Sequence, residues 1–265
     1  MRNIPPYMAI AIPARASIRK VLFAFAALAI GAASTAQGAD LVASAAVSLT
    51  DAFREIGRSF VAAQSGTTVA FNFAATDVLL AQLSKGAPAD VFAAADEESM
   101  NRAEREGLLL PGSRHDFAAN RLVMIVPNSA SGVATIEELA LPRFARIAMG
   151  SPRTVPAGRY ARGALERAKL WDKIESKCVF ALNVRQVLDY VARGDADVGF
   201  VYATDAAVMR DKVKIALDVP TPTPIRYPVA VLRASRHPSE ARAFVESLIA
   251  DPARKVLASY GFALP

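Results

Sequence analysis

The chain has 265 residues, of which 53% are hydrophobic and 21% are charged. This composition supplies enough apolar side chains for a folded core and excludes a disordered or low-complexity protein. The single cysteine, Cys178, excludes an intramolecular disulfide framework and a cysteine-rich zinc site.

The first 39 residues have the features of a secretory signal peptide. Basic residues occur within the first 20 positions, and no acidic residue precedes Asp40. The apolar run Val21–Ala33 follows, and its length is too short to span a bilayer comfortably. We place the cleavage site after Ala39, with Ala36 and Gly38 as alternatives.

The export signal accounts for most of the net charge. The whole chain carries a formal charge of +6 from 31 basic and 25 acidic residues. Removing residues 1–39 takes away four basic residues and no acidic residue, which leaves 27 against 25, a charge of +2. Because a strong basic excess was the main argument for a nucleic-acid partner, the mature chain does not favour one. We expect an exported, periplasmic protein that does not span the membrane when mature.

Strand and helix patterns alternate through the first part of the mature chain. Apolar residues at Leu49, Phe53, Ile56 and Phe60 mark one face of a helix. Gly107 occupies the position that commonly follows a helix end. The predicted strands are 41–46, 67–73 and 90–94, and the predicted helices are 49–60, 78–83 and 97–106. Such alternation is typical of a parallel sheet with helices on both faces.

The pattern starts again after residue 120. The predicted strands are 121–126, 147–149, 178–182, 197–201 and 226–232, and the predicted helices are 158–169, 184–193, 239–249 and 252–259. The proline-rich segment 219–224 predicts an extended crossing. The fold class is therefore α/β with two lobes, each a mostly parallel sheet flanked by helices, and a ligand cleft between them. We expect lobe 1 to contain 40–119 plus 225–265 and lobe 2 to contain 120–224.

Four junctions between a strand and a helix carry polar or small residues. Ser48 and Asp51 form a capping pattern, Thr76 supplies a hydroxyl, Ala157 lies in a Pro-Ala-Gly turn, and Asn183 is a candidate N-cap. Helix starts present unpaired N–H groups and partial positive charge. Four of them at one cleft would form an anion site of neutral donors. Alternatively, each residue only caps its own helix, and the two interpretations are compatible.

Several segments, in order along the mature chain, resemble the molybdate-binding proteins of ABC importers. The specific part of the resemblance is the pair Gly-Ala-Pro-Ala-Asp and Val-Pro-Ala-Gly. It implies a type II periplasmic binding protein that holds molybdate or tungstate between its lobes. The segments are Ala45–Phe53, Lys85–Phe92, Val155–Tyr160, Gly199–Tyr202, Tyr227–Ala230 and Tyr260–Phe262.

The resemblance implies a set of oxyanion contacts. Ser48 matches the first hydroxyl, the N–H groups of Ala157 and Val184 match the amide donors, and Tyr202 matches the phenol. The periodicity of apolar residues by itself predicts only that Tyr202 is an aromatic residue at the end of a strand. The family usually has a serine-rich turn where this chain has Ala74–Asp77, so we assign Thr76 as the second hydroxyl. By this resemblance, these residues are expected to contact the oxyanion, and none is expected to be a direct metal ligand.

Charged residues near these positions have ordinary interpretations. Asp77 would repel a dianion, and we expect it to favour the helix dipole and to point outward. This predicts that Asp77→Ser leaves molybdate affinity similar or slightly higher. Arg153, Arg159 and Arg185 lie close to the donor turns and could attract an anion, but we expect solvated surface side chains.

The sequence does not favour an enzyme. His115 and His237 occur in polar, turn-rich contexts and are expected in exposed loops, and no common catalytic motif is present. Cys178 is expected as an inert core thiol. We predict no catalytic residue and no cofactor, a small oxyanion and an inner-membrane ABC permease as partners, and a monomer. The alternatives are a binder of sulfate, phosphate or an organic anion, and a secreted enzyme that acts on a phosphorylated small molecule.

Overall fold

The structure is a computed structural model that describes residues 39–64 and 66–265. The predicted signal peptide lies outside these residues except for Ala39, which is buried. Among the described helices, none combines the length and apolar character needed to cross a bilayer.

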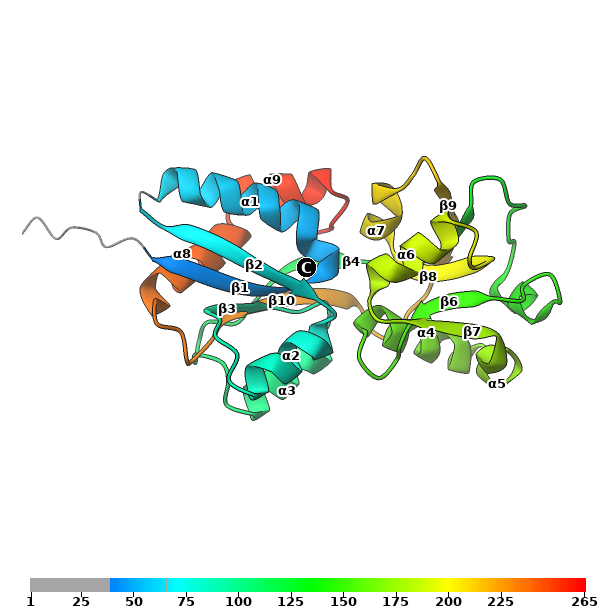
Figure 1. Ribbon diagram of the computed structural model, residues 1–265, viewed down its shortest axis with the longest axis horizontal. Coiled ribbons are helices and arrows are strands. Elements are labelled where there is room, and N and C mark those ends of the chain that lie inside the picture. The colour runs from blue at the N-terminus through cyan, green and yellow to red at the C-terminus, as the bar shows by residue number, and fades with distance from the viewer. Residues whose placement is uncertain (1–38, 65) are drawn as a thin grey trace, which may run out of the picture. The chain divides into compact units, whose positions relative to one another are not determined.

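A first sheet of five strands has the order β2-β1-β3-β10-β4 (Figure 1). Two neighbouring pairs are parallel, β1 with β2 and β1 with β3, whereas β10 runs antiparallel to both β3 and β4. The strands are β1 (Asp40–Ala46), β2 (Thr68–Ala74), β3 (Val91–Ala93), β4 (His115–Asn120) and β10 (Ile225–Val231).

A second sheet has the order β7-β6-β8-β5-β9 and repeats this pairing scheme. β6 is parallel to β7 and β8, and β5 is antiparallel to β8 and β9. The strands are β5 (Leu122–Pro127), β6 (Ile147–Gly150), β7 (Cys178–Ala181), β8 (Val198–Tyr202) and β9 (Val213–Val219).

The predicted α/β fold class with two helix-flanked sheets is confirmed. The expectation that each sheet is mostly parallel is wrong, because each has two parallel and two antiparallel pairings, and the antiparallel ones involve the strands next to the crossings between the sheets. The chain passes from one sheet to the other between β4 and β5, and again between β9 and β10. The lobe boundaries that the sequence suggested stay a prediction.

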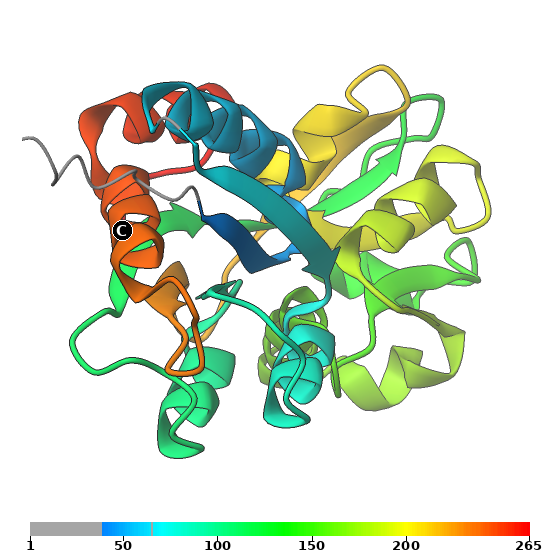
Figure 2. The ribbon, with the colours of Figure 1, turned by 60° about the vertical axis from the view of Figure 1, so that its left-hand side comes forward.

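Helices cover both faces of each sheet (Figures 1 and 2). α1, α8 and α9 lie on one face of the first sheet, and α2 and α3 lie on the other. Around the second sheet, α4 and α5 lie opposite α6 and α7. The helices are α1 (Thr50–Ala63), α2 (Thr76–Ser84), α3 (Glu97–Arg105), α4 (Pro156–Arg167), α5 (Trp171–Ile174), α6 (Val184–Ala192), α7 (Ala203–Val208), α8 (Pro238–Ile249) and α9 (Asp251–Ser259), with 3-10 turns η2 (Val47–Leu49), η3 (Ile136–Ala140) and η4 (Glu175–Lys177).

The predicted apolar stripes form the contacts between helices and sheets. Phe53, Ile56 and Phe60 of α1 are buried. The rings of Phe53 and Phe117 have centroids 5.5 Å apart, and Phe244 of α8 meets Phe53 edge to face. These contacts pack α1 against β4 and α8 against α1.

Two strands, β4 and β9, were not predicted, and each lies at the edge of its sheet. An edge strand packs against one neighbour, so its apolar pattern is weak. His115 begins β4 and is half-buried, and His237 directly precedes α8 and is also half-buried. The expectation of an exposed loop is therefore wrong for His115, whereas His237 does lie in a loop but is half-buried instead of exposed.

Cys178 begins β7, another edge strand, and is half-buried instead of lying in the core. Its thiol donates to the carbonyl of Ile174 at 3.4 Å, and burial raises its pKa to about 11. Because the thiolate is the reactive form, this environment keeps the thiol inert.

Candidate functional site

One small cavity is lined by all the residues that the sequence analysis assigned to the ligand. Its volume is about 10 Å³. Ser48 lies in η2, and the other residues lie at the start of a helix or the end of a strand. The cavity brings together Ser48, Thr76, Ala157, Val184 and Tyr202, and its other lining residues are Ala46, Val47, Ala74, Ala75, Ala95, Val155 and Pro156. Their contact with an oxyanion stays a prediction.

The two predicted hydroxyl groups do not cap their own helices. The N-cap positions of α1 and α2 are Leu49 and Ala75, and neither helix start has a side-chain cap. Instead, Ser48 Oγ lies 3.1 Å from the hydroxyl of Tyr227, and Thr76 Oγ1 accepts from the N–H of Ala95 at 3.2 Å. The simple capping interpretation is therefore wrong for both residues, and both hydroxyls are held at the cavity.

The second sheet contributes two helix starts to the cavity. Asn183 caps α6, because its Oδ1 accepts from the N–H of Gln186 at 3.0 Å, as predicted. α4 begins at Pro156 and has no side-chain cap. The first N–H groups of an α-helix have no acceptor within the helix, so Ala157 and Val184 can donate to a ligand.

Tyr202 closes the cavity from the end of β8. Its side chain is 1% exposed, and its hydroxyl donates to the carbonyl oxygen of Ala95 at 3.3 Å. Its ring also meets the ring of Tyr227, with centroids 5.7 Å apart. Burial raises the pKa of Tyr202 well above its usual value, so the phenol remains a neutral donor. The signal that could have identified it is the junction itself, since α7 begins at Ala203.

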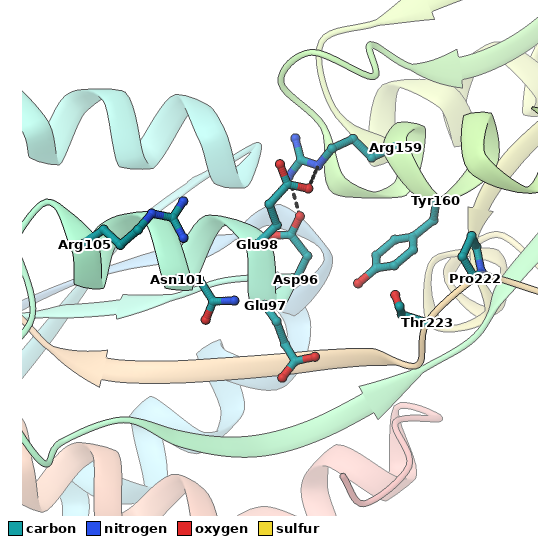
Figure 3. Close-up of a pocket in the computed structure, with 9 residues that line it drawn as sticks. All are labelled: Asp96, Glu97, Glu98, Asn101, Arg105, Arg159, Tyr160, Pro222 and Thr223. Carbon is teal, nitrogen blue, oxygen red and sulfur yellow. Dashed lines mark hydrogen bonds and ion pairs between the residues drawn. The ribbon is translucent and has the colours of Figure 1, made fainter.

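The expectation of a solvated surface side chain is wrong for Arg159. Its guanidinium contacts Asp77 at 2.6 Å and also pairs with Asp96 and Glu98 (Figure 3). Asp77 is only 6% exposed and makes a second ion pair, at 3.1 Å, with Arg102. The expectation that Asp77 points outward is also wrong, because an opposite charge from the other sheet's helices holds it inside.

Arg185 is paired in the same manner, so the solvated interpretation is wrong here too. Its Nη2 lies 2.9 Å from Asp51 of α1, and its Nε pairs with Asp205 of α7. Asp205 is fully buried, and burial raises its pKa while Arg185 opposes that shift. Arg153 is exposed, as expected.

A larger hollow of about 400 Å³ lies beside Arg159 (Figure 3). Asp96, Glu97 and Glu98 line it together with Tyr160 and Arg159. Its three carboxylates outnumber its two arginines, Arg105 and Arg159, so the lining carries a net negative charge and does not suit a dianionic ligand. The small cavity has neutral donors instead and is the candidate site.

The site is built for hydrogen bonding, with no acid or histidine among the residues that line it. Within the described part of the chain, no group of three or more histidine, cysteine or acidic side chains is placed to hold a metal ion. The carboxylates of Asp77 and Asp51, which are close in sequence to Thr76 and Ser48, are paired with arginines. Elements of both sheets therefore present helix starts and neutral hydroxyl groups to one small cavity.

Comparison with known proteins assigns the family. Residues 41–263 match the bacterial extracellular solute-binding proteins, and the chain belongs to this family. The match spans both sheets and every helix described above.

Individual relatives agree with this assignment. A provisionally named ABC transporter substrate-binding lipoprotein of Bacillus subtilis strain 168, YvgL, is 37% identical and aligns over 84% of this chain and 85% of its own length. The molybdate-binding protein ModA of Escherichia coli K12 is 33% identical, over 92% of this chain and 97% of the relative. The periplasmic molybdate-binding protein of Azotobacter vinelandii has a similar structure, with a TM-score of 0.73 and 26% identity over 85% of this chain and 99% of that chain.

Proposed function

We propose that this protein binds molybdate or tungstate between its two sheets and delivers it to the permease of an ABC importer. The observation that carries the proposal is that Ser48, Thr76, Ala157, Val184 and Tyr202 line one cavity. The similarity to proteins named for molybdate binding supports the same ligand. The proposal includes export by residues 1–39, a periplasmic location, action as a monomer, and the lobes 40–119 plus 225–265 and 120–224.

Neutral donors are sufficient for tight binding of a dianion. Each hydrogen bond to a charged group contributes about 1.5–3 kcal/mol. About six such bonds would supply roughly 9–18 kcal/mol before the costs of ordering and closure, and nanomolar binding requires about 12 kcal/mol. A smaller tetrahedral anion such as sulfate cannot reach every donor at once. It would leave buried N–H groups unpaired, so we expect weaker binding.

Isothermal titration calorimetry with molybdate, tungstate, sulfate and phosphate tests the function. We expect saturable binding of molybdate and tungstate, weaker binding of sulfate and phosphate, and no consumption of ligand. Preference for phosphate, sulfate or an organic anion would favour the alternative binding protein, and turnover of a phosphorylated compound would favour an enzyme.

Two single-atom deletions test the site. Tyr202→Phe and Ser48→Ala each remove one hydroxyl, and each should weaken molybdate binding by about 10- to 150-fold, the equivalent of one charged hydrogen bond. Ser59→Ala is a matched control, because Ser59 is an exposed hydroxyl on α1 that bonds only its own helix. Unchanged affinity in both site variants would refute the assignment of these residues.

The raised pKa of Tyr202 predicts the pH dependence of binding. A phenol of ordinary pKa near 10 would be half ionised at pH 10, and a phenolate cannot donate to an anion. Because the pKa is raised, the proton is lost only above pH 10, so molybdate affinity should change by less than about twofold from pH 7 to 10. A decline in affinity with a midpoint near pH 10 in the wild type, absent from Tyr202→Phe, would contradict this.

A further inference from the structure

Each backbone turn that is predicted to face the anion is followed by an arginine that crosses to the first sheet's helices. Arg159 lies two residues after Ala157 on α4, and Arg185 directly follows Val184 on α6. α4 and α6 pack on the second sheet, whereas α1, α2 and α3 pack on the first. The arginines therefore connect the elements that carry the amide donors to the elements that carry the hydroxyl donors.

The first bridge, which we name clamp A, consists of Arg159, Asp77 and Asp96. Arg159 Nη1 donates to Asp77 Oδ2 at 2.6 Å, and Nη2 donates to Asp96 and to Ser99 Oγ. The arginine side chain is 20% exposed, and the two aspartates are 6% and 4% exposed. Water and salt screen such a pair much less than a surface pair. Asp77 directly follows Thr76, so clamp A joins a predicted hydroxyl donor to a predicted amide donor.

The second bridge, clamp B, consists of Arg185, Asp51 and Asp205. Arg185 Nη2 donates to Asp51 Oδ2 at 2.9 Å across the sheets, while Nε pairs with Asp205 on its own side. Asp205 has one buried oxygen without a hydrogen-bond partner, so Arg185 is needed to compensate its charge. Asp51 is 37% exposed and supplies only the crossing contact.

The two clamps lie on opposite faces of the sheets. In Figure 1, α2, α3 and α4 lie below the sheets and α1, α6 and α7 lie above them. A ligand held by donors from both sheets can leave only when the sheets separate on at least one side. Separation on either side requires a charged, hydrogen-bonded pair to break.

We infer that Arg159 and Arg185 are positioning residues that hold the amide-bearing starts of α4 and α6 against Thr76 and Ser48, and that they set the rate of ligand release. This inference rests on the proposed function. Breaking a buried, hydrogen-bonded charge pair acts mainly on dissociation. A protein that spends less time in its binding-competent form also loses apparent affinity in proportion.

The test uses protein purified from cells that express the full chain. The variants are Arg159→Gln for clamp A and Asp51→Asn for clamp B, which leaves Arg185 with Asp205. Arg162→Gln is the control, since Arg162 pairs with Glu166 within α4 and both side chains are about half exposed. The measurements are molybdate affinity by calorimetry, release of radiolabelled molybdate into excess unlabelled molybdate, and the unfolding midpoint.

Each clamp variant should release molybdate at least about tenfold faster, with its dissociation constant raised by the same factor and its association rate within about threefold of wild type. Arg159→Lys keeps the positive charge but loses the guanidinium that contacts two partners at once. Its release rate should therefore lie between those of the wild type and Arg159→Gln. Arg162→Gln should match wild type.

Wild-type release rates in both clamp variants, with molybdate still bound, would overturn the inference. Failure of the wild-type protein to bind molybdate would instead contradict the proposed function. If Arg159→Gln does not fold, Asp51→Asn still decides the outcome, because Asp51 is partly exposed and leaves no buried charge behind.

Discussion

Replacing Gly158 with alanine should abolish tight ligand binding and destabilise the protein by about 3 kcal/mol or more. An added Cβ would lie 2.0 Å from the carbonyl oxygen of Gly150 and 2.6 Å from its carbonyl carbon. Both atoms belong to the backbone at the end of β6, so no side-chain rotation relieves the clash. Comfortable contact between such atoms requires about 3.5 Å, so the start of α4 must move by more than about 1 Å.

That movement would carry the N–H of Ala157 away from the cavity. Urea denaturation measures the free energy of unfolding, and calorimetry with molybdate measures the affinity. Gly163→Ala is the matched control on the same helix. Its Cβ would lie 3.3 Å from a ring carbon of Pro222, and the gain in helix propensity offsets that tight contact. We expect the control to stay within about 1 kcal/mol of wild type. Wild-type stability in Gly158→Ala would mean that α4 does not approach β6 so closely.

Replacing Val184 with proline should weaken molybdate binding by about 10- to 150-fold with the fold retained. Val184 is the first residue of α6, the position at which proline is best tolerated in a helix. Asn183, which precedes it, already has an extended backbone with φ −160° and ψ 171°, and proline favours an extended residue before it. The substitution therefore deletes one N–H donor and leaves the cap of the helix in place.

Val184→Ala is the control for this experiment, because it removes more of the buried side chain than proline does and keeps the N–H group. Its molybdate affinity should stay within about threefold of wild type, although its stability should fall, as for other shortened core side chains. Calorimetry on the two variants distinguishes the effect of losing the N–H donor from the effect of losing side-chain packing. Equal affinity in Val184→Pro and wild type would show that the Val184 N–H does not contact the ligand.

The arginines close to Ala157 and Val184 are engaged in ion pairs. Arg159 and Arg185 are paired with carboxylates, so neither offers a free positive charge to the cavity. Because Asp77 is a partner of Arg159, we now expect Asp77→Ser to weaken molybdate binding instead of leaving it similar or slightly higher. Under the proposed function, we therefore expect selection of a dianion to depend on the neutral donors and on the size of the cavity.

Local patterns in the sequence determined most of the elements and the candidate contacts. The spacing of Phe53, Ile56 and Phe60 predicts α1, and Asn183 predicts the start of α6, because a helix and its cap depend on residues within one or two turns. Tyr202 came only from the family resemblance, since the short helix that begins at Ala203 was not predicted and the junction at Tyr202 was therefore missed.

Only the tertiary structure decided how side chains distant in sequence meet. The pairs Arg159–Asp77 and Arg185–Asp51 join residues 82 and 134 positions apart, and the edge strands β4 and β9 are defined by their neighbours. The sequence indicates which hydroxyls and helix starts exist. Whether Ser48 and Thr76 cap a helix or face a ligand depends on their contacts with Tyr227 and Ala95. These partners are distant in the sequence and leave no periodic signal along the chain.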